Sequence, residues 1–294
     1  MTSHDVVNHV RRLAGVRQVG HTGTLDPSAT GVLVVLVGPA TRLAQYLANC
    51  GKVYRAVLRL GITTTTYDAD GEVTGESVVE VAQADFEQAL AQFRGNILQV
   101  PPMYSAIKVA GKKLYDLARQ GKEVQREPRP VTIERVEVLC WDPPTVQIEV
   151  ACSGGTYIRS LAHDLGQVLG CGAHLATLIR CQVGDFRLEQ SHSLDELREL
   201  AAEQRFTEAL LPPQLALGAM PGVVLNPTQA QAVAHGQAIR PSVECPAGAM
   251  LQAWDSQGHL LAVLIPVSPG EWRPKLVFSE AIADARRYLL QESD

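Results

Sequence analysis

Residues 20–37 read GHTGTLDPSATGVLVVLV and join a glycine-rich loop to the longest apolar run in the chain. The loop brings together an imidazole, several hydroxyls and one carboxylate, that of Asp26. Glycines let a backbone approach a ligand closely. The run at residues 31–37 has the length of one buried strand. The loop does not match the phosphate-binding pattern, so its spacing alone favours an ordinary turn that starts at Asp26-Pro27.

The composition is that of a folded, cytoplasmic protein without a membrane anchor. The chain has 294 residues, of which 46% are hydrophobic and 19% charged, so global disorder is excluded and two domains are expected. No apolar stretch approaches the roughly 20 residues of a membrane span, and the N-terminus lacks the pattern of a signal peptide. The six cysteines form no C-x-x-C pair, which predicts reduced, mostly buried thiols and no metal site.

The order of helical and extended patterns predicts an α+β fold. Helices and strands mix without strict β-α alternation, which favours a mixed, largely antiparallel sheet. Pro212-Pro213 and the glycines around residue 220 mark a boundary, with a catalytic domain at 1–218 and a small β-rich domain at 219–294. Ser3 is the expected cap of the first helix and Gly15 its end. Helices are expected near 3–14, 40–47, 84–93, 157–169, 193–204 and 228–234, and strands near 31–37, 52–60, 131–139 and 146–152.

Two further clusters could serve a site. Tyr157 and Arg159 stand two apart at a strand-to-helix junction, where a guanidinium could hold a carboxylate ionised and in place. An exposed arginine beside a half-buried tyrosine is the commoner arrangement. On the strand at 52–60, Tyr54 and Arg55 point to opposite faces, so one can face a cleft while the other is solvated. Alternatively, Tyr54 packs in the core.

Basic residues gather in two segments, although the net charge is −5. Residues 1–60 hold seven basic and two acidic side chains, and residues 101–135 hold eight and four. Aromatic residues interleave with the cations of the second segment, as suits contact with a nucleic-acid backbone. A solvated basic loop is the simpler alternative. The candidate phosphate-binding residues are Lys108, Lys112, Lys113 and Arg119.

Taken together, these segments resemble the TruB family of RNA pseudouridine synthases. The matching stretches are GHTGTLDPSATGVLVV, KVYRAVLRLG with TTTTYDADGE, VPPMYSAIKVAGKKLYDLARQG, CSGGTYIRSLAHDLG and GCGAHLATLIRCQVGDF. They follow the order and spacing of the family from Ser3 to about Phe186. The segment at 101–130 is similar to the RNA-gripping insertion of the bacterial, stand-alone branch. Residues 219–294 are similar to the PUA-like tail of the family.

The resemblance implies the reaction and its partners. A uridine in RNA, most often uridine 55 in the T-loop of tRNA, becomes pseudouridine when its N-glycosidic bond breaks and the base rejoins through carbon 5. The family uses no metal or organic cofactor. Its stand-alone members imply a monomer that binds the T-arm of tRNA without a guide RNA or an obligate protein partner.

The resemblance also implies roles for individual residues. Asp26 corresponds to the catalytic aspartate, a carboxylate that can act as a covalent nucleophile when ionised. Arg159 corresponds to the arginine that pairs with it. His21 corresponds to the histidine that helps to hold the RNA with its target base turned out of the stack, which the buried glycosidic bond requires.

Three other positions correspond to the pocket that receives the target base. Tyr54 occupies the place of the tyrosine that stacks on this base, and Tyr157 and Leu178 match its tyrosine and leucine. The chain also departs from the family pattern. A strand and a Lys-Pro-x-Gly segment normally precede Thr-Ser-His, whereas this chain begins at Met1, and losing that strand would expose a sheet edge. Gly154 and Ser28 stand where many members carry Lys and Leu.

Two other functions compete with an RNA-modifying enzyme. The basic segment and the PUA-like tail would also suit an RNA-binding or RNA-folding factor with little or no catalytic activity. A hydrolase of small glycosides fits poorly, because such enzymes usually place two carboxylates around the bond and the loop at Asp26 offers one.

Overall fold

The computed structural model describes residues 1–105, 107–109, 111–118, 120–121, 124–242, 245–246 and 248–278. Its contacts divide the chain into two compact units. The first comprises Met1–Leu25, Leu33–Ala48 and the described part of Gln190–Asp294, and the second comprises Asp26–Val32 and Asn49–Glu189. The division into domains at 1–218 and 219–294 stays a prediction. Within the described ranges, no helix has both the length and the apolar character needed to cross a membrane.

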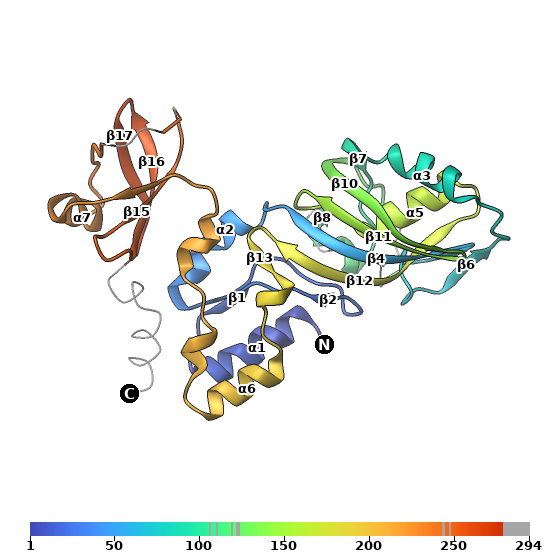
Figure 1. Ribbon diagram of the computed structural model, residues 1–294, viewed down its shortest axis with the longest axis horizontal. Helices are drawn as coiled ribbons and strands as arrows, with labels where there is room; N and C mark the ends of the chain where they lie inside the picture. The colour runs from blue at the N-terminus through green and yellow to red at the C-terminus, as the bar shows by residue number, and fades with distance from the viewer. Residues whose placement is uncertain are drawn as a thin grey trace. The chain divides into compact units, whose positions relative to one another are not determined.

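The second unit is built on a seven-stranded sheet in the order β13-β12-β4-β11-β10-β7, with β2 beside β12. Every pair is antiparallel except β2 with β12, which confirms the predicted α+β class. Helices α3 and α5 cover one face (Figure 1). The strands are β2 (Thr30–Gly31), β4 (Lys52–Leu60), β7 (Gly95–Gln99), β10 (Arg129–Asp142), β11 (Thr145–Cys152), β12 (Ala173–Val183) and β13 (Phe186–Arg187), and the helices are α3 (Gln83–Ala91) and α5 (Ile158–Val168).

Strand β4 runs through the middle of this sheet and shows why the core forms. Its side chains alternate between buried and partly or fully exposed, with Leu58 and Leu60 almost completely buried. They pack against Leu161 and Leu165 of α5. Tyr54 is buried and Arg55 is exposed, so the predicted opposite orientation of these neighbours is confirmed. Tyr54 also belongs to the core cluster of this unit, as the alternative reading expected. Two small hairpins extend from the sheet, β5 (Ile62–Thr64) with β6 (Val73–Glu76) and β8 (Lys108–Val109) with β9 (Lys112–Lys113), the latter leading into α4 (Leu114–Ala118).

The apolar run at 31–37 does not form one strand, and this prediction was wrong. Its first residue, Gly31, ends β2, whereas β3 (Val35–Val37) pairs with β1 (Val19–His21) in the first unit. Gly31 has a φ of +102°, a conformation that breaks a regular strand. Alternate residues of the run are buried, although the run is divided between two strands.

The N-terminal helix α1 (Ser3–Ala14) is capped one residue earlier than predicted. The Thr2 hydroxyl accepts a hydrogen bond from the backbone of Asp5, and the Asp5 carboxylate accepts one from the backbone of Thr2. Ser3 lies inside the helix instead, and its hydroxyl bonds the backbone of Leu25 at 2.9 Å. Gly15 ends the helix in the left-handed conformation, as predicted. The unit continues with the 3-10 helix η1 (Gly38–Leu43) and α2 (Ala44–Leu47), where one helix was expected.

The rest of the first unit follows the predicted order. Ser193 and Glu196 form the predicted capping box of α6 (Leu194–Ala202), which packs against α1. A four-stranded sheet in the order β14-β15-β16-β17 then confirms the small β-rich C-terminal module. Its strands are β14 (Gly222–Val224), β15 (Leu251–Trp254), β16 (Leu260–Ser268) and β17 (Glu271–Val277), with α7 (Pro227–Ala234) alongside, and 3-10 turns occur at η2 (Leu188–Gln190), η3 (Phe206–Ala209) and η4 (Pro213–Leu217).

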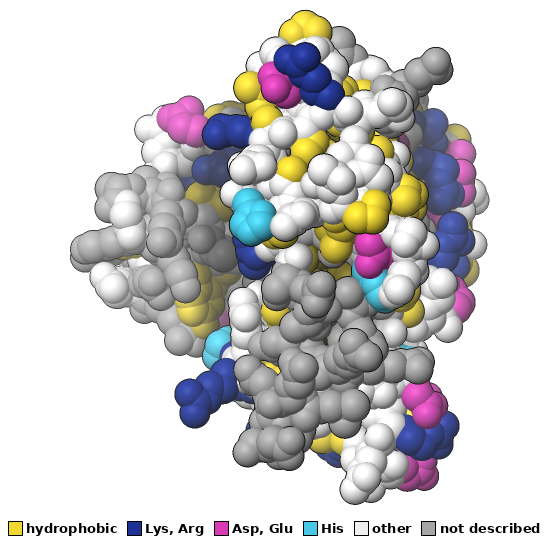
Figure 2. Space-filling model, turned by 90° about the vertical axis from the view of Figure 1, so that its left-hand side faces the viewer, with side chains coloured by type: hydrophobic (Ala, Val, Ile, Leu, Met, Phe, Trp, Pro, Cys, Tyr) yellow, Lys and Arg dark blue, Asp and Glu magenta, His cyan; other side chains and the backbone are white. Residues whose placement is uncertain are grey.

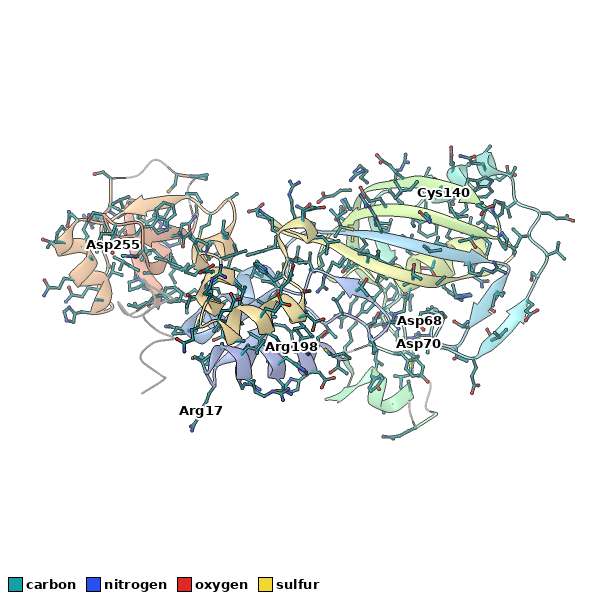
Figure 3. The ribbon with its side chains drawn as sticks, turned by 60° about the horizontal axis from the view of Figure 1, so that its bottom comes forward. Arg17, Asp68, Asp70, Cys140, Arg198 and Asp255 are labelled. Atoms are coloured by element: carbon teal, nitrogen blue, oxygen red, sulfur yellow. The ribbon has the colours of Figure 1, made fainter. Side chains whose placement is uncertain are left out.

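The cysteines are free, as predicted, but they are less buried than expected. Cys152 and Cys171 lie in the core, whereas Cys140 is exposed on β10 (Figure 3). Its neighbour Trp141 packs against Phe86 of α3, so Cys140 faces the other, uncovered side of the strand.

Candidate active site

Asp26 and Arg159 meet in the second unit as a two-point ion pair. The Arg159 Nε lies 2.9 Å from Asp26 Oδ2, and Nη2 donates to Oδ1 at 3.0 Å. Because each carboxylate oxygen binds a different guanidinium nitrogen, this fork fixes the orientation of the carboxylate and also balances its charge. Only 5% of the Arg159 side chain is exposed, against 37% for Asp26. The alternative of an exposed arginine is therefore wrong here. The buried Arg159 holds the carboxylate of Asp26, which stays partly accessible to solvent.

A second carboxylate, Asp68, shares the same guanidinium. Its Oδ2 lies 3.5 Å from the Arg159 Nε. Its other oxygen accepts hydrogen bonds from the Thr66 hydroxyl and the Asp70 backbone. Asp68 and Asp70 lie side by side on the loop between β5 and β6 (Figure 3). Asp68 is absent from the predicted site residues. The sequence includes this stretch, within TTTTYDADGE, in the family resemblance, but nothing in its spacing points to Arg159.

Backbone carbonyls complete the surroundings of Arg159. Its Nη1 donates to the carbonyl of Thr66 at 3.4 Å, and its Nη2 donates to that of Tyr104 at 3.0 Å. The guanidinium thus meets two carboxylates and two carbonyls, which is how a buried charge becomes tolerable. Because α5 begins at Ile158, Arg159 stands in the first helical turn, and the packed helix fixes its direction.

Burial raises the pKa of the Asp26 carboxyl above its ordinary value. The guanidinium of Arg159 lowers this pKa, and the neighbouring charge of Asp68 raises it. A carboxylate whose pKa is raised in this way is a stronger base than a solvated one. Such a group suits nucleophilic or proton-transfer chemistry.

Tyr54 contributes a protonated phenol next to this carboxylate. Burial is the largest cause that raises its pKa, to about 12, and the charge of Asp26 adds to the effect. A hydrogen bond with the side chain of Arg180 acts in the opposite direction. At neutral pH, Tyr54 therefore offers a flat ring and a hydroxyl that keeps its proton.

Tyr157 stands at the N-terminal end of α5, where Gln99 of β7 fixes its backbone. The Gln99 side chain accepts a hydrogen bond from the Tyr157 backbone N–H at 2.8 Å and donates one to its carbonyl at 3.0 Å. Burial raises the pKa of Tyr157, and the charge of Asp26 contributes in the same direction. The two tyrosines therefore both lie within electrostatic reach of Asp26.

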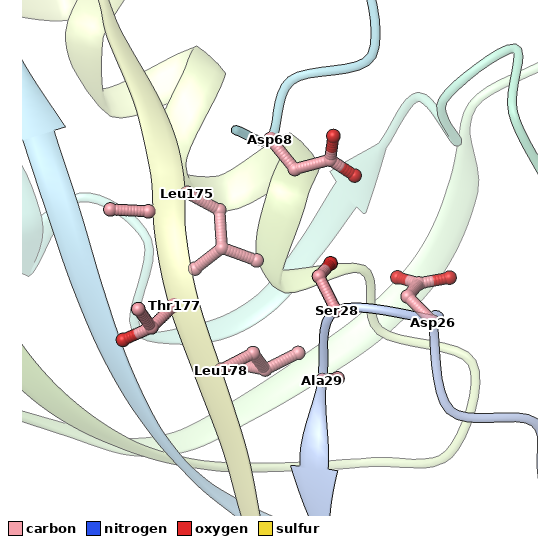
Figure 4. Close-up of a pocket in the computed structure, with 8 residues that line it drawn as sticks. Asp26, Ser28, Ala29, Asp68, Leu175, Thr177 and Leu178 are labelled. Carbon is pink, nitrogen blue, oxygen red and sulfur yellow. The ribbon is translucent and has the colours of Figure 1, made fainter. Parts of the chain in front are cut away.

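A small pocket opens beside Asp26 (Figure 4). Leu175 and Leu178 point into it from β12, opposite the segment with Asp26 and Ser28, while Asp68 closes the far side. Apolar side chains therefore line one wall of the pocket and carboxylates the other. The lining residues are Asp26, Ser28, Ala29, Asp68, Leu175, Ala176, Thr177 and Leu178.

Arg180 of β12 anchors the segment that follows Asp26. Its side chain, only 2% exposed, donates to the carbonyl of Val32 at 2.7 Å, and its own carbonyl accepts from the Val32 backbone at 2.8 Å. Gly31 lies against the Arg180 backbone, where a Cβ would stand 2.2 Å from the carbonyl oxygen. The loop is thereby tied to the strand that carries Leu178.

We expect Gly31→Ala to disrupt this contact. The substitution adds both left-handed strain and a clash with backbone, so we expect a loss of at least about 2 kcal/mol in unfolding free energy. Gly95→Ala is the matched control, because Gly95 has a φ of +83° and open space around its Cβ position. Urea unfolding measures both. Equal losses would show that the approach to Arg180 carries no weight.

The remaining predicted residues belong to the first unit or are described in part. His21 ends β1 in the first unit, where it pairs with Val35. Lys108, Lys112 and Lys113 lie in the β8–β9 hairpin, of which the structure describes the backbone at these positions. Arg119 lies outside the described residues. Within the described ranges, no group of three or more histidine, cysteine, aspartate or glutamate side chains could hold a metal ion.

Comparisons with known proteins cover most of the chain. The family model described as "TruB family pseudouridylate synthase (N terminal domain)" matches residues 11–158, and that described as "tRNA pseudouridylate synthase B C-terminal domain" matches residues 159–217. The chain belongs to the TruB family. Membership of the TruB family makes it a pseudouridylate synthase, which confirms the resemblance of its motifs.

TruB relatives from two bacteria illustrate the degree of similarity. The tRNA pseudouridine synthase B of Pseudomonas aeruginosa (strain UCBPP-PA14) is 45% identical over 278 residues, 94% of this chain and 91% of the relative. That of Symbiobacterium thermophilum is 52% identical over 242 residues, 81% and 79% of the two chains. The TruB fold is also similar to a chain in "Crystal Structure of a Cbf5-Nop10-Gar1 Complex", with 27% identity, a TM-score of 0.69, and coverage of 97% of this chain and 78% of that one.

Proposed function

We propose that this TruB protein converts uridine 55 in the T-loop of tRNA to pseudouridine, with Asp26 as the nucleophile. The curated relatives carry the name tRNA pseudouridine synthase B, which supports uridine isomerisation in tRNA. The observation that carries the assignment of Asp26 is its forked ion pair with a buried arginine, beside a pocket with apolar side chains on one wall.

The reaction is an isomerisation, so its atoms balance without a co-reactant. The bond between the ribose carbon and N1 of uracil breaks, the base turns, and a new bond joins the same ribose carbon to C5. The proton on C5 leaves, and N1 gains one. The Asp26 carboxylate forms a transient covalent bond with either the ribose or the base, and the pocket holds the base while it turns.

The neighbouring side chains would prepare Asp26 for this step. Arg159 keeps the carboxylate ionised and directs it, because its Nε and Nη2 bind the two oxygens separately. Tyr54 supplies a flat, protonated ring that can stack on the target base, and Leu178 supplies an apolar contact opposite Asp26. A uridine within a stacked loop must turn outward to reach this pocket.

Release of tritium from carbon 5 of uridine tests the function. A T-arm stem-loop that carries tritium at its uridine 55 should lose the label to water in proportion to pseudouridine formed. The same stem-loop with tritium at the other uridines controls for selectivity. If the protein binds the stem-loop and releases no tritium, the alternative of an RNA-binding or RNA-folding factor is favoured, which the basic segment at 101–135 supports.

We expect activity to fall on the acid side of neutrality with the ionisation of Asp26. The nucleophile is active when deprotonated, so the rate rises with pH through its pKa, which burial raises above the ordinary aspartate value. Tyr54→Phe should leave the position of this acid limb unchanged, because the phenol is protonated throughout the range. The pH dependence of kcat for a T-arm stem-loop measures the effect. A midpoint at or below the ordinary value would contradict it.

We expect the affinity for the T-arm to fall steeply with salt and to depend on the basic segment. Lys112→Glu or Arg119→Glu should weaken binding severalfold, because each removes a phosphate contact and adds repulsion. Arg240→Glu in the C-terminal part is the control, since its side chain is 76% exposed. On the face shown in Figure 2, Asp and Glu side chains lie among the Lys and Arg side chains, so this face is not uniformly basic. Fluorescence titration at several salt concentrations measures the affinities. If Arg240→Glu weakened binding more than Lys112→Glu or Arg119→Glu, the basic segment would not be the main RNA contact.

We further propose that the protein acts as a monomer in the cytoplasm, with no metal, organic cofactor, guide RNA or obligate protein partner. The proposal rests on the resemblance to the stand-alone members of the family, and the curated relatives are named as tRNA pseudouridine synthase B without a partner in the name. The proposed assembly can be checked by light scattering of the protein with and without the T-arm stem-loop.

A further inference from the structure

A stacked pair of rings, Tyr67 and His163, lies next to the ion pairs of the site and has no part in the chemistry proposed above. The ring centroids are 3.8 Å apart and the planes differ by 13°. His163 stands on α5 four residues after Arg159, so the two side chains project from the same face of the helix. Two successive turns of α5, one with Arg159 and one with His163, therefore contact the loop between β5 and β6.

Arg159 contacts the residues on both sides of Tyr67. It donates to the carbonyl of Thr66 at 3.4 Å and lies 3.5 Å from the carboxylate of Asp68. Three consecutive loop residues thus touch α5, the outer two through the guanidinium and the middle one through the His163 ring. The loop and the catalytic arginine are held as one assembly.

The backbone of Tyr67 needs such support. Its φ is +65°, in the left-handed region that bulky side chains rarely adopt. A residue keeps this conformation where the surrounding structure fixes it. Leu175 of β12 donates to the Tyr67 carbonyl at 3.0 Å, and the ring stack fixes the other end of the residue. Turning the chain at this point lets Thr66 and Asp68 face the same guanidinium.

The His163 ring meets Tyr67 as a flat surface, and its Nδ1 takes no part in holding the loop. Its Nδ1 is buried with no hydrogen-bond partner among the described residues. Burial, with a contribution from the charge of Arg126, lowers its pKa, so the ring is neutral at pH 7. An apolar aromatic ring should therefore serve in its place.

We propose that the Tyr67–His163 stack is a positioning device for the reaction: it holds the Thr66–Asp68 turn against Arg159 and so keeps Asp26 directed into the pocket. Both residues are positioning residues, because neither needs to touch the substrate. The inference rests on the function proposed for Asp26. It predicts that loss of the stack lowers kcat and leaves KM for the T-arm unchanged.

The test compares His163→Ala with His163→Phe at a temperature where circular dichroism shows both to be folded. We expect His163→Ala to lose about tenfold in kcat, since small misplacements of reacting groups are costly, and His163→Phe to stay within twofold of the unchanged protein. Tyr67→Leu and Tyr67→Phe repeat the comparison from the loop, where the side chain is half-buried and a folding defect is easier to avoid. The double variant with His163→Ala and Tyr67→Leu should be no slower than either single one.

A second readout reports the assembly without any RNA. The Arg159 Nε–H group, almost completely buried between two carboxylates, should give a slowly exchanging proton signal in NMR spectra, assigned by its loss in Arg159→Lys. Exchange should quicken in His163→Ala and Tyr67→Leu and stay unchanged in both phenylalanine variants. If the aliphatic variants acted only by lowering global stability, the phenylalanine variants would not be expected to restore slow exchange.

Three results would overturn the proposal: a kcat loss below fivefold in His163→Ala and Tyr67→Leu, a loss that falls on KM, or phenylalanine variants as slow as the aliphatic ones. The failure of the proposed function is a separate outcome. In that case the unchanged protein releases no tritium, and the exchange of the Arg159 proton alone decides whether the stack holds the assembly.

Discussion

Asp26→Asn is expected to abolish tritium release while leaving binding of the T-arm within about twofold. The amide has nearly the shape of the carboxylate but cannot act as a nucleophile, so we expect a loss of about 10⁴-fold or more in kcat. Arg159 can still donate to the amide oxygen, which keeps the side chain at position 26 in place. Single-turnover tritium release and fluorescence titration separate the two effects. Measurable turnover, or a large loss of affinity, would contradict the role given to Asp26.

The same substitution should also stabilise the folded protein at neutral pH. The pKa of Asp26 is raised in the folded state, so its ionised form weakens folding as the pH rises through that pKa. Asparagine removes this cost. The gain in Tm over the unchanged protein should therefore be larger at pH 7.5 than at pH 5. A lower Tm at pH 7.5 would show that the ion pair with Arg159 outweighs the burial of the charge.

The local parts of the fold were predictable because short-range patterns determine them. The strand at 52–60 alternates between buried and exposed positions, and its bounds match the prediction. The helix after Ser193 carries its own capping box. The cap of α1 was misplaced by one residue because Thr2 and Ser3 are chemically equivalent as caps, and only the packing of Ser3 against Leu25 distinguishes them.

The parts that failed depend on contacts between distant segments. The run at 31–37 is apolar enough for one strand, but the pairing of Gly31 with β12 and of Val35–Val37 with β1 divides it. The pair of Asp26 and Arg159 spans 133 positions and was reached through the family resemblance. Asp68 was missed because Asp68-Ala-Asp-Gly71 is a sequence typical of an exposed turn, whereas Asp68 is buried next to the left-handed Tyr67. Buried charges of this kind can be found only once the elements are placed.

Arg159→Met is the second substitution for which we expect a large effect, a loss of about 10³-fold in kcat. The variant leaves the carboxyls of Asp26 and Asp68 close together without a cation between them. The pKa of Asp26 rises further, because Arg159 lowers it and Asp68 raises it. A smaller fraction of the carboxyl is then ionised at neutral pH, and the remaining nucleophile is no longer aligned by the fork.

Arg135→Met is the matched control for this experiment. Arg135 also binds two carboxylates, those of Glu137 and Glu149 at 2.8 Å each, but its side chain is 44% exposed. Exposed pairs contribute about 1 kcal/mol or less, so the control should retain full activity and nearly full stability. Arg159→Lys should fall between the two, because one ammonium keeps the charge and loses the fork.

The pH dependence of kcat separates alignment from ionisation in Arg159→Met. If loss of the cation acts by raising the pKa of Asp26, the acid limb moves to higher pH and activity partly recovers in alkaline buffer. If loss of alignment dominates, the limb moves while the plateau stays low, and Arg159→Lys restores the position of the limb without restoring the plateau. An acid limb in the unchanged position would mean that Arg159 does not control the ionisation of Asp26, and that its buried fork serves the fold alone.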